Sequence, residues 1–437
     1  MNPFYNSSKS NKKIIITLSL IFSVFTSFSQ SNLKTEKCFI ISDIHFDPLF
    51  ENHKDTSLYN KMVNTPITKW SELFENQTQQ SFISSSLLGK DANYAILKSA
   101  LINMSKRLPA PKFIIIAGDF IWHGAKPQDS ILKKKTMSFI AGLFNKYFPD
   151  TIIIPVLGNN DTYGEDYQLQ NSAFLSDFAE AWSLNLPKNV APLLKSKGYY
   201  AYKIGELKLL VLNSATVSYN SEYEKQAIEM LEWLKNNLAD ATTKNVWIIS
   251  HIPPGLNGYN NKNMWNVEQQ QIYINTVLTY AKKMRLGIAS HTHFNEFKIF
   301  YDSEVQPKAF MRIIPSICSN HGNNPSFEVA DFNVSSGTLV NENNYVLNLS
   351  SIPNQTPYKE VLWSKSLNIS NLLNNHKINA PNLSNLITNV KDNSDTEKFS
   401  IYLKFYTLNT EINSKKTINH ENLLNYLRAD SLKLLKR

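Results

Sequence analysis

The sequence predicts an α/β layered fold, in which buried strands alternate with helices. Three observations lead to this prediction. From Cys38 onward, short runs rich in Ile and Val alternate with longer amphipathic segments. Several of the short runs are apolar throughout, as expected for strands that are covered on both faces. The chain of 437 residues, of which 42% are hydrophobic, is also long enough to bury a sizeable core.

Seven apolar runs are predicted to be strands. They span residues 38–41, 113–117, 152–157, 207–212, 246–249, 287–289 and 310–314. The third run contains Pro155, which has no backbone N–H to donate to a neighbouring strand. This strand is therefore predicted to lie at a sheet edge or in an irregular position.

Between these runs, apolar residues recur at the spacing of a helical face. One predicted helix carries Leu97, Leu101 and Met104, and another carries Tyr223, Ala227, Leu231, Leu234 and Leu238. Residues 51–90 have few periodic apolar positions, so we interpret them as an ordered insertion or a long loop.

The composition changes after Leu349. Residues 351–437 are rich in Asn, Ser and Lys, and their leucines recur at helical spacing near residues 372–386 and 423–435. We therefore predict a main domain over residues 38–350, followed by a smaller, mainly helical region that packs on it.

The first residues differ in kind from the rest of the chain. Three lysines precede an apolar run over residues 14–28, which ends near the small residues Ser27 and Ser29. This order is typical of a secretory signal, and the run is short for a membrane span. We predict a signal peptide over residues 1–29 and a linker over residues 30–37, with an uncleaved N-terminal anchor as the alternative. The mature chain is then expected to have no transmembrane span and to be secreted, periplasmic or extracellular.

Charge and cysteine content narrow the functions that the chain can have. The formal net charge is +9, but the 45 Lys and Arg and the 36 Asp and Glu are scattered without a compact basic block. A nucleic-acid partner is therefore not expected. Cys38 and Cys318 are the only cysteines and form no CxxC pair, so metal ligands must come from His, Asp and Asn. One disulfide and two buried free thiols are both compatible with this pair.

Five of the predicted strands end in a potential metal ligand. These ligands are Asp43 and His45 after the first strand, Asp119 after the second, Asn159 after the third, His251 after the fifth, and His291 and His293 after the sixth. Ligand sites form at the carboxyl ends of strands in α/β sheets, so these side chains are expected to meet. Imidazole, carboxylate and amide donors together suit zinc, manganese or iron. Each motif alone has a structural alternative, such as a turn at an Asp or a packing role for a His. Their repetition at five strand ends favours a metal site.

In order and spacing, these motifs resemble the calcineurin-like metallophosphoesterase superfamily. Within it, residues 41–48 (ISDIHFDP), 250–255 (SHIPPG) and 323–329 (NNPSFEV) are similar to the acid sphingomyelinase-like phosphodiesterases. Residues 158–161 (GNND) resemble the endopolyphosphatases instead. The resemblance covers residues 38–349 and, more weakly, the C-terminal part. It implies two packed mixed β-sheets flanked by helices, which is the metallophosphoesterase sandwich.

The resemblance also implies two divalent cations, zinc in the first place and manganese or iron as alternatives. One cation would be held by Asp43, His45, Asp119 and His293, and the other by Asp119, Asn159, His251 and His291, so that Asp119 serves both. A hydroxide that bridges the two cations would then attack phosphorus without a covalent enzyme intermediate.

Two residues are predicted to act beside the metals. The superfamily usually has a histidine directly after the motif asparagine, whereas this chain has Asn160. Asn160 can donate a hydrogen bond to a phosphate oxygen but cannot supply a proton. His123 matches a second histidine of the sphingomyelinase-like proteins, so we assign it the role of proton donor or phosphate contact. A packing histidine is the alternative.

The sequence therefore predicts an exported two-metal phosphoesterase that hydrolyses phosphodiester or phosphoanhydride bonds. Its expected substrates are small phosphoesters, nucleotides, phospholipid head groups or polyphosphate. Acid sphingomyelinases are rich in cysteine and have a lipid-engaging N-terminal domain, and neither feature is expected in this chain. Action on soluble phosphoesters or phosphoanhydrides is therefore expected ahead of action on membrane sphingomyelin. The alternatives are a phosphomonoesterase or polyphosphatase of the same fold, and a metal-binding protein without turnover, which Asn160 would motivate.

Overall fold

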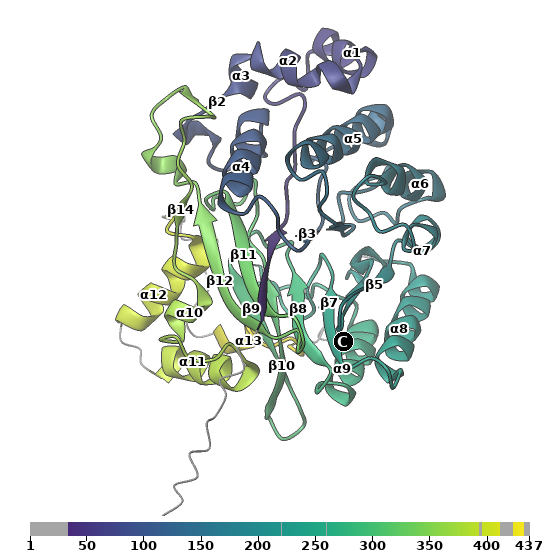
Figure 1. Ribbon diagram of the computed structural model, residues 1–437, viewed down its shortest axis with the longest axis vertical. Helices are drawn as coiled ribbons and strands as arrows, with labels where there is room; N and C mark the ends of the chain where they lie inside the picture. The colour runs from purple at the N-terminus through teal and green to yellow at the C-terminus, as the bar shows by residue number, and fades with distance from the viewer. Residues whose placement is uncertain (1–33, 220, 259, 393–395, 411–422, 432–437) are drawn as a thin grey trace, which may run out of the picture. The chain divides into compact units, whose positions relative to one another are not determined.

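The computed structural model describes residues 34–219, 221–258, 260–392, 396–410 and 423–431 (Figure 1). The described residues from Lys34 onward form one compact unit. The predicted signal peptide, residues 1–29, lies outside the described residues. Among the helices of the described part, none combines the length and the apolar character that crossing a bilayer requires.

The first of two six-stranded sheets contains the N-terminal strand. Its order is β14 (Ser364–Lys365), β12 (Leu339–Val346), β11 (Ser326–Asn333), β1 (Thr35–Ile41), β3 (Ile114–Ile116) and β4 (Ile153–Pro155). Strands β1, β3 and β4 are parallel, and β11 runs antiparallel to β1. Strand β4 is the edge strand, so the prediction made from Pro155 is confirmed.

The second six-stranded sheet is also mixed. Its order is β5 (Tyr200–Ile204), β6 (Leu207–Val211), β7 (Asn245–Ile249), β8 (Met284–Ala289), β10 (Pro307–Ile313) and β9 (Glu296–Tyr301). The four central strands are parallel, and β5 and β9 are antiparallel strands at the edges. The predicted class of two mixed sheets with flanking helices is confirmed, and each of the seven predicted strands is present.

The two sheets pack face to face through aromatic side chains. Trp247 of β7 contacts Phe113, at the start of β3, with ring centroids 5.9 Å apart. It also contacts Phe332 of β11 at 5.3 Å. All three side chains are fully buried or nearly so, and the indole N–H of Trp247 donates to the carbonyl of Gly337 at 2.6 Å. Large apolar area and a satisfied donor together stabilise this interface.

Helices cover the outer faces of the sheets. They include α4 (Tyr94–Arg107), α5 (Ser130–Tyr147), α6 (Ser172–Ala181), α7 (Ala191–Lys197), α8 (Glu224–Ala239) and α9 (Val267–Thr279) (Figure 1). Both helices that the apolar spacing predicted are present, as α4 and α8. Asn93 caps α4 by accepting a hydrogen bond from the N–H of Ile96 at 3.0 Å, and Lys106 and Arg107 lie in its last turn, where they complement the helix dipole.

Residues 51–90 form an ordered insertion, and the alternative of a long loop is wrong. They contain α1 (Thr56–Asn64), α2 (Trp70–Glu75), α3 (Thr78–Ser81), the short strand β2 (Phe82–Ile83) and two 3-10 turns, Ile67–Lys69 and Ser85–Leu87. The helices are too short to show a repeating apolar face. Buried aromatic residues hold them instead, because Trp70 and Phe74 pack on Phe139 of α5 with ring centroids 5.4 and 5.5 Å apart.

The C-terminal segment contacts the core at several points. It contains β13 (Thr356–Pro357), β14, α10 (Ile369–Leu372), α11 (Ala380–Asp392), α12 (Thr396–Thr407) and α13 (Leu423–Tyr426). The N–H of Asn295 donates to the carbonyl of Tyr406 at 3.0 Å, and that of Ile299 in β9 donates to Leu427 at 2.8 Å. Strand β13 pairs with β2, and β14 extends the first sheet.

A buried ion cluster on β10, β11 and β12 joins the two sheets. Arg312 of β10, in the second sheet, donates from Nε to Glu342 of β12 at 2.7 Å and from Nη2 to Glu328 of β11 at 3.2 Å. Nη2 also donates to Asn295 at 2.7 Å. All three charged side chains are fully buried. A buried pair that loses one partner leaves an uncompensated charge in the interior.

We expect Arg312→Ala to lower the free energy of unfolding by about 3–5 kcal/mol, because the buried acidic pair of Glu328 and Glu342 would lose its cation. Urea denaturation of the metal-loaded protein measures this loss. The control is Lys308→Ala on the same strand, which removes an exposed ion pair to Asp302 of 2.9 Å and should cost less than about 1 kcal/mol. Equal losses in the two variants would contradict the structural role of the cluster.

Candidate metal centre

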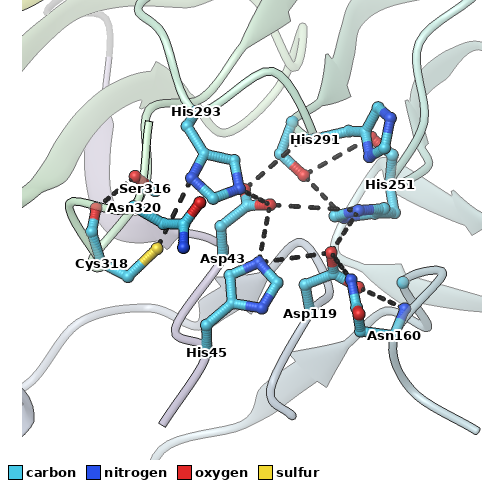
Figure 2. Close-up of polar contacts among 12 residues, drawn as sticks. Asp43, His45, Asp119, Asn160, His251, His291, His293, Ser316, Cys318 and Asn320 are labelled. Atoms are coloured by element: carbon cyan, nitrogen blue, oxygen red, sulfur yellow. Dashed lines mark hydrogen bonds and ion pairs between the residues drawn. The ribbon is translucent and has the colours of Figure 1, made fainter. Parts of the chain in front are cut away.

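The candidate ligands leave both sheets at the carboxyl ends of parallel strands. Asp43 and His45 follow β1, Asp119 follows β3, Asn159 follows β4, His251 follows β7, and His291 and His293 follow β8. Figure 2 shows Asp43, His45, Asp119 and the three later histidines pointing toward one another. The structure thus brings together residues that are up to 250 positions apart in the sequence, since the two sheets present these strand ends at one place.

Five of the seven candidate ligands have a left-handed backbone conformation. The φ angles are 47° at Asp43, 40° at His45, 57° at Asp119, 71° at His291 and 67° at His293. Residues other than glycine rarely adopt this region, and doing so costs of order 1–3 kcal/mol each. Strain of this kind concentrates at functional sites, so its repetition here supports a function for the cluster.

Two glycines permit the close approach of the ligand loops. A Cβ at Gly158 would lie 2.0 Å from Oδ1 of Asp119, and a Cβ at Gly118 would lie 2.6 Å from Nδ1 of His251. Real Cβ atoms do not come that close to other heavy atoms. The loops after β3, β4 and β7 can therefore pack together only because these two positions lack a side chain.

We expect Gly158→Ala to lower the metal affinity at least about tenfold, because the new methyl group would displace the carboxylate of Asp119. Competition with a chelator, followed by elemental analysis, measures this change. Gly142→Ala is the matched control, since Gly142 lies in α5 with no atom within 4 Å of an added Cβ. The control should keep its metal and gain up to about 1 kcal/mol of stability. An unchanged affinity in Gly158→Ala would contradict this geometry.

Two groups of candidate ligand atoms share Asp119. Oδ2 of Asp119 lies 3.1 Å from Nε2 of His251 and 3.4 Å from Nε2 of His45. Nε2 of His251 is also 3.0 Å from Oδ1 of Asn159, and Nε2 of His293 is 3.4 Å from Oδ1 of Asp43. Ligand atoms of Asp43, His45 and Asp119 lie within 4.8 Å of one another, and so do those of Asp119, His251 and His291. A third group with ligand atoms at this range consists of His45, His123 and His293.

Two histidines are held so that one nitrogen faces the carboxylates. Nδ1 of His45 is 2.8 Å from the carbonyl of Ile121, and Nδ1 of His251 is 2.8 Å from the carbonyl of Ala117. An Nδ1–H that donates to a carbonyl leaves the lone pair of Nε2 directed toward the carboxylate oxygens. Nε2 of His45 and Oδ1 of Asp43 are buried and have no hydrogen-bond partner in the protein. Groups at this range need a proton or a metal ion between them, and this set of imidazole and carboxylate donors fits divalent metal.

The pKa values of the histidines also indicate that the cluster attracts positive charge. Burial lowers the pKa of both His45 and His251, but the adjacent Asp119 outweighs it and raises these pKa values to about 10 and about 9. Burial and the neighbouring His251 lower the pKa of His291 to about 4. The two carboxylates therefore attract protons onto the nearest imidazoles, and a metal ion that binds there displaces those protons.

His123 lies at the edge of the cluster and is held by a carboxylate. Nδ1 of His123 is 2.6 Å from Oδ1 of Asp91, and its backbone N–H donates to Oδ2 of Asp91 at 2.8 Å. The ring stacks on His45 with centroids 3.8 Å apart, and the side chain remains 33% exposed. The amide of Asn320 donates to the same Asp91 at 3.2 Å. Sequence reasoning did not find Asp91 or Asn320, because neither residue follows an apolar strand.

Asn160 contacts Asp119 and is nearly buried. Its backbone N–H donates to Oδ1 of Asp119 at 2.9 Å, and its Nδ2 donates to Oδ2 at 3.0 Å (Figure 2). Asp161, the last residue of the GNND motif, accepts hydrogen bonds from the N–H groups of Asp119, Phe120 and Gly158, each at 2.8 Å. Sequence reasoning missed Asp161, although the motif contained it. This carboxylate ties the loop of Asp119 to the loop of Asn159.

Both cysteines are buried free thiols, so of the two alternatives the second is confirmed. Burial raises the pKa of each thiol, which keeps both protonated at neutral pH. Cys38 lies in β1. Cys318 follows β10, and its Sγ lies 3.5 Å from Nδ1 of His293.

Comparisons with known proteins found a family model, curated relatives and solved structures that are similar to this chain. Residues 37–295 match the calcineurin-like phosphoesterase family. Sphingomyelinase phosphodiesterase C of Dictyostelium discoideum is 25% identical over 399 residues, which cover 83% of this chain and 86% of that protein. Acid sphingomyelinase-like phosphodiesterase 3b of Mus musculus is 24% identical over 335 residues, which cover 71% and 70% of the two chains. The match to sphingomyelin phosphodiesterase of Homo sapiens, at 27% identity, spans only 40% of that protein. Among solved structures, a purple acid phosphatase of Lupinus luteus is 8% identical with a TM-score of 0.41, covering 76% of this chain and 53% of that one.

Proposed function

Because the chain belongs to the calcineurin-like phosphoesterase family, we propose that it is an exported two-metal phosphodiesterase acting on small phosphodiester or phosphoanhydride substrates. One observation carries the proposal. Nε2 of His251 and Nε2 of His45 converge on Oδ2 of the buried Asp119 at 3.1 and 3.4 Å, so protons or metal ions between these atoms must balance its charge. Such a buried charge is costly unless cations balance it.

The two cations would be divided between the two groups of ligands. We assign one to Asp43, His45, Asp119 and His293, and the other to Asp119, Asn159, His251 and His291. The mixture of imidazole, carboxylate and amide donors favours zinc, with manganese or iron as alternatives. When bound, two such ions polarise the phosphoryl oxygens and lower the pKa of an attacking water.

The protein supplies orientation and a proton around that centre. The carbonyls of Ile121 and Ala117 fix the imidazoles of His45 and His251, so that these rings need not reorient when substrate binds. We assign to His123 the protonation of the leaving oxygen. Its Nδ1–H donates to Asp91, which orients the ring and leaves Nε2 to hold the transferable proton.

Asn160 has a different role from the histidine usual at its position. Both of its N–H donors contact Asp119, so we assign it the orientation of that carboxylate rather than proton transfer. The same observation favours a second candidate function, a metal-binding protein without turnover. Full metal content with no hydrolysis, unrepaired by Asn160→His, would support that candidate.

The substrate class follows from the relatives and from the chain itself. The relatives are named as sphingomyelin, sphingomyelinase or acid sphingomyelinase-like phosphodiesterases, which supports a phosphodiester substrate such as a phospholipid head group ester. Nucleotides and polyphosphate remain in the proposed range, and a phosphomonoesterase is the alternative within the same fold. We also propose that residues 1–29 direct export, which N-terminal sequencing of the mature protein from a secreting host would test.

The test is a substrate panel with the mature, metal-loaded chain. The panel contains bis-(p-nitrophenyl) phosphate, p-nitrophenyl phosphate, p-nitrophenylphosphorylcholine, a nucleoside triphosphate and polyphosphate. It distinguishes hydrolysis of diesters, monoesters, choline esters and anhydrides. We expect hydrolysis of a diester or an anhydride that a chelator abolishes and added zinc or manganese restores. A faster monoester rate would favour the phosphomonoesterase, and no chelator-sensitive hydrolysis of any substrate would contradict the proposal.

A further inference from the structure

Residues 316–318 form a short strap between the two loops that hold Asp43 and His293. The backbone N–H of Cys318 donates to the carbonyl of Asp43 at 3.1 Å. The backbone N–H of Ser316 donates to the carbonyl of His293 at 3.4 Å. Asp43 comes from the first sheet and His293 from the second. The strap therefore fixes two candidate ligands of the same cation with respect to each other.

The thiol of Cys318 contacts the ring of His293 directly. Sγ lies 3.5 Å from Nδ1, and both side chains are buried (Figure 2). The other ring nitrogen, Nε2, lies 3.4 Å from Oδ1 of Asp43. At His45 and His251, a backbone carbonyl 2.8 Å away holds the corresponding Nδ1. At His293 the thiol therefore stands in the position that a carbonyl oxygen has at the other two histidines.

The identity of this partner matters for metal binding because of the histidine tautomer. A neutral imidazole carries one proton, and only the nitrogen without it can bind a metal. An Nδ1–H that donates to sulfur leaves Nε2 of His293 unprotonated and aimed at the cation. Residues that hydrogen-bond to a metal ligand typically change the metal affinity 10–100-fold when they are replaced. Sulfur is a weak acceptor, so we expect an effect at the lower end of this range.

We propose that Cys318 is a positioning residue for His293, whose sulfur accepts the Nδ1–H and so keeps Nε2 available to one of the two metal ions. This inference rests on the metal assignment in the proposed function but not on hydrolysis. It concerns the ion held by Asp43, His45, Asp119 and His293. His293 is absent from the ligand set of the other ion, which should not respond.

The experiment is a chelator titration of the full mature chain loaded with zinc, followed by the zinc content per chain. In Cys318→Ala and Cys318→Val, the affinity for one of the two zinc ions should fall about tenfold below that of the wild type. The affinity for the second ion should not change. Cys318→Ser restores an acceptor and should retain both ions within about threefold of the wild-type affinity. Thermal unfolding of the same samples separates metal loss from a loss of folding.

The chain offers a matched control in its other buried thiol. Cys38→Ala removes a buried sulfur whose contact is the carbonyl of Ala330 at 3.9 Å, so it should lower stability without changing zinc release. Wild-type zinc release in Cys318→Ala and Cys318→Val would overturn the proposal. It would also be overturned if Cys318→Ser released zinc as Cys318→Ala does, because sulfur would then act only by packing. A wild-type chain that binds two ions and hydrolyses nothing would refute the proposed enzyme while leaving the role of Cys318 intact.

Discussion

Asp119→Ala is expected to remove both metal ions and to reduce kcat/KM for diesters on the order of 10⁴-fold or more, the scale seen when a central catalytic group of a hydrolase is deleted. The physical reason is that one carboxylate belongs to both ligand groups. Oδ2 of Asp119 faces His45 and His251, and the loop that carries Asn159 packs directly against this side chain. Elemental analysis after gel filtration and the rate with bis-(p-nitrophenyl) phosphate measure the two effects.

The control for this variant is another buried carboxylate, which follows the neighbouring strand of the same sheet. Asp47 follows β1, is 4% exposed, and bonds to His53 at 2.8 Å and to the N–H of Leu49 at 2.9 Å without contacting a candidate ligand. Asp47→Ala should lose stability and keep both ions. Two ions per chain in folded Asp119→Ala would show that the ligand assignment is wrong.

Asp91→Asn and His123→Gln are both expected to slow the cleavage of diesters with poor leaving groups about 10²–10⁴-fold, the usual contribution of general acid catalysis. An alkoxide needs a proton as it leaves, whereas p-nitrophenolate does not. The same variants should therefore lose less than about tenfold with bis-(p-nitrophenyl) phosphate. Rates with a methyl and a p-nitrophenyl ester of the same phosphate measure the contrast.

Two further variants serve as controls: the double variant of Asp91→Asn with His123→Gln, and a substitution in a second His–Asp pair. Asp91 acts through His123, so the double variant should be no slower than His123→Gln alone. The pair of His53 and Asp47 has the same kind of contact, 2.8 Å, but lies outside the ligand cluster, and His53→Gln should leave both rates unchanged. A loss in Asp91→Asn that is equal for both leaving groups would refute the proton-transfer role.

The strands and the candidate ligands could be predicted because their signals are local. A continuous apolar run such as residues 113–117 predicts a buried strand, and the polar residue that ends it, Asp119, predicts a place at the sheet edge. Strands β11 and β12 escaped prediction because they carry many polar residues. The sequence of β12 is LVNENNYV, and its buried Glu342 is compensated by Arg312 from the other sheet, a contact that local patterns do not encode.

The parts of the site that escaped prediction depend on contacts across long stretches of sequence. Asp91 lies 32 positions from His123 and is preceded by no apolar run, so only the folded chain pairs them. Cys318 has no metal-binding motif around it, and its contact with His293 arises where a strap crosses between the sheets. The left-handed backbone conformation at Asp43 and His291 could not be predicted either, because Asp and His adopt it only occasionally.

The ligands of each proposed ion come from both sheets, since β1, β3 and β4 belong to one and β7 and β8 to the other. Metal uptake is therefore thermodynamically linked to the docking of the two halves of the sandwich. An ion present at a hundredfold excess over its dissociation constant adds about 2.7 kcal/mol to the folded state. Removal of the ions by a chelator should therefore lower the free energy of unfolding of this protein. Conversely, a substitution deep in the interface that lets one sheet slide over the other will weaken metal retention, even where it touches no ligand.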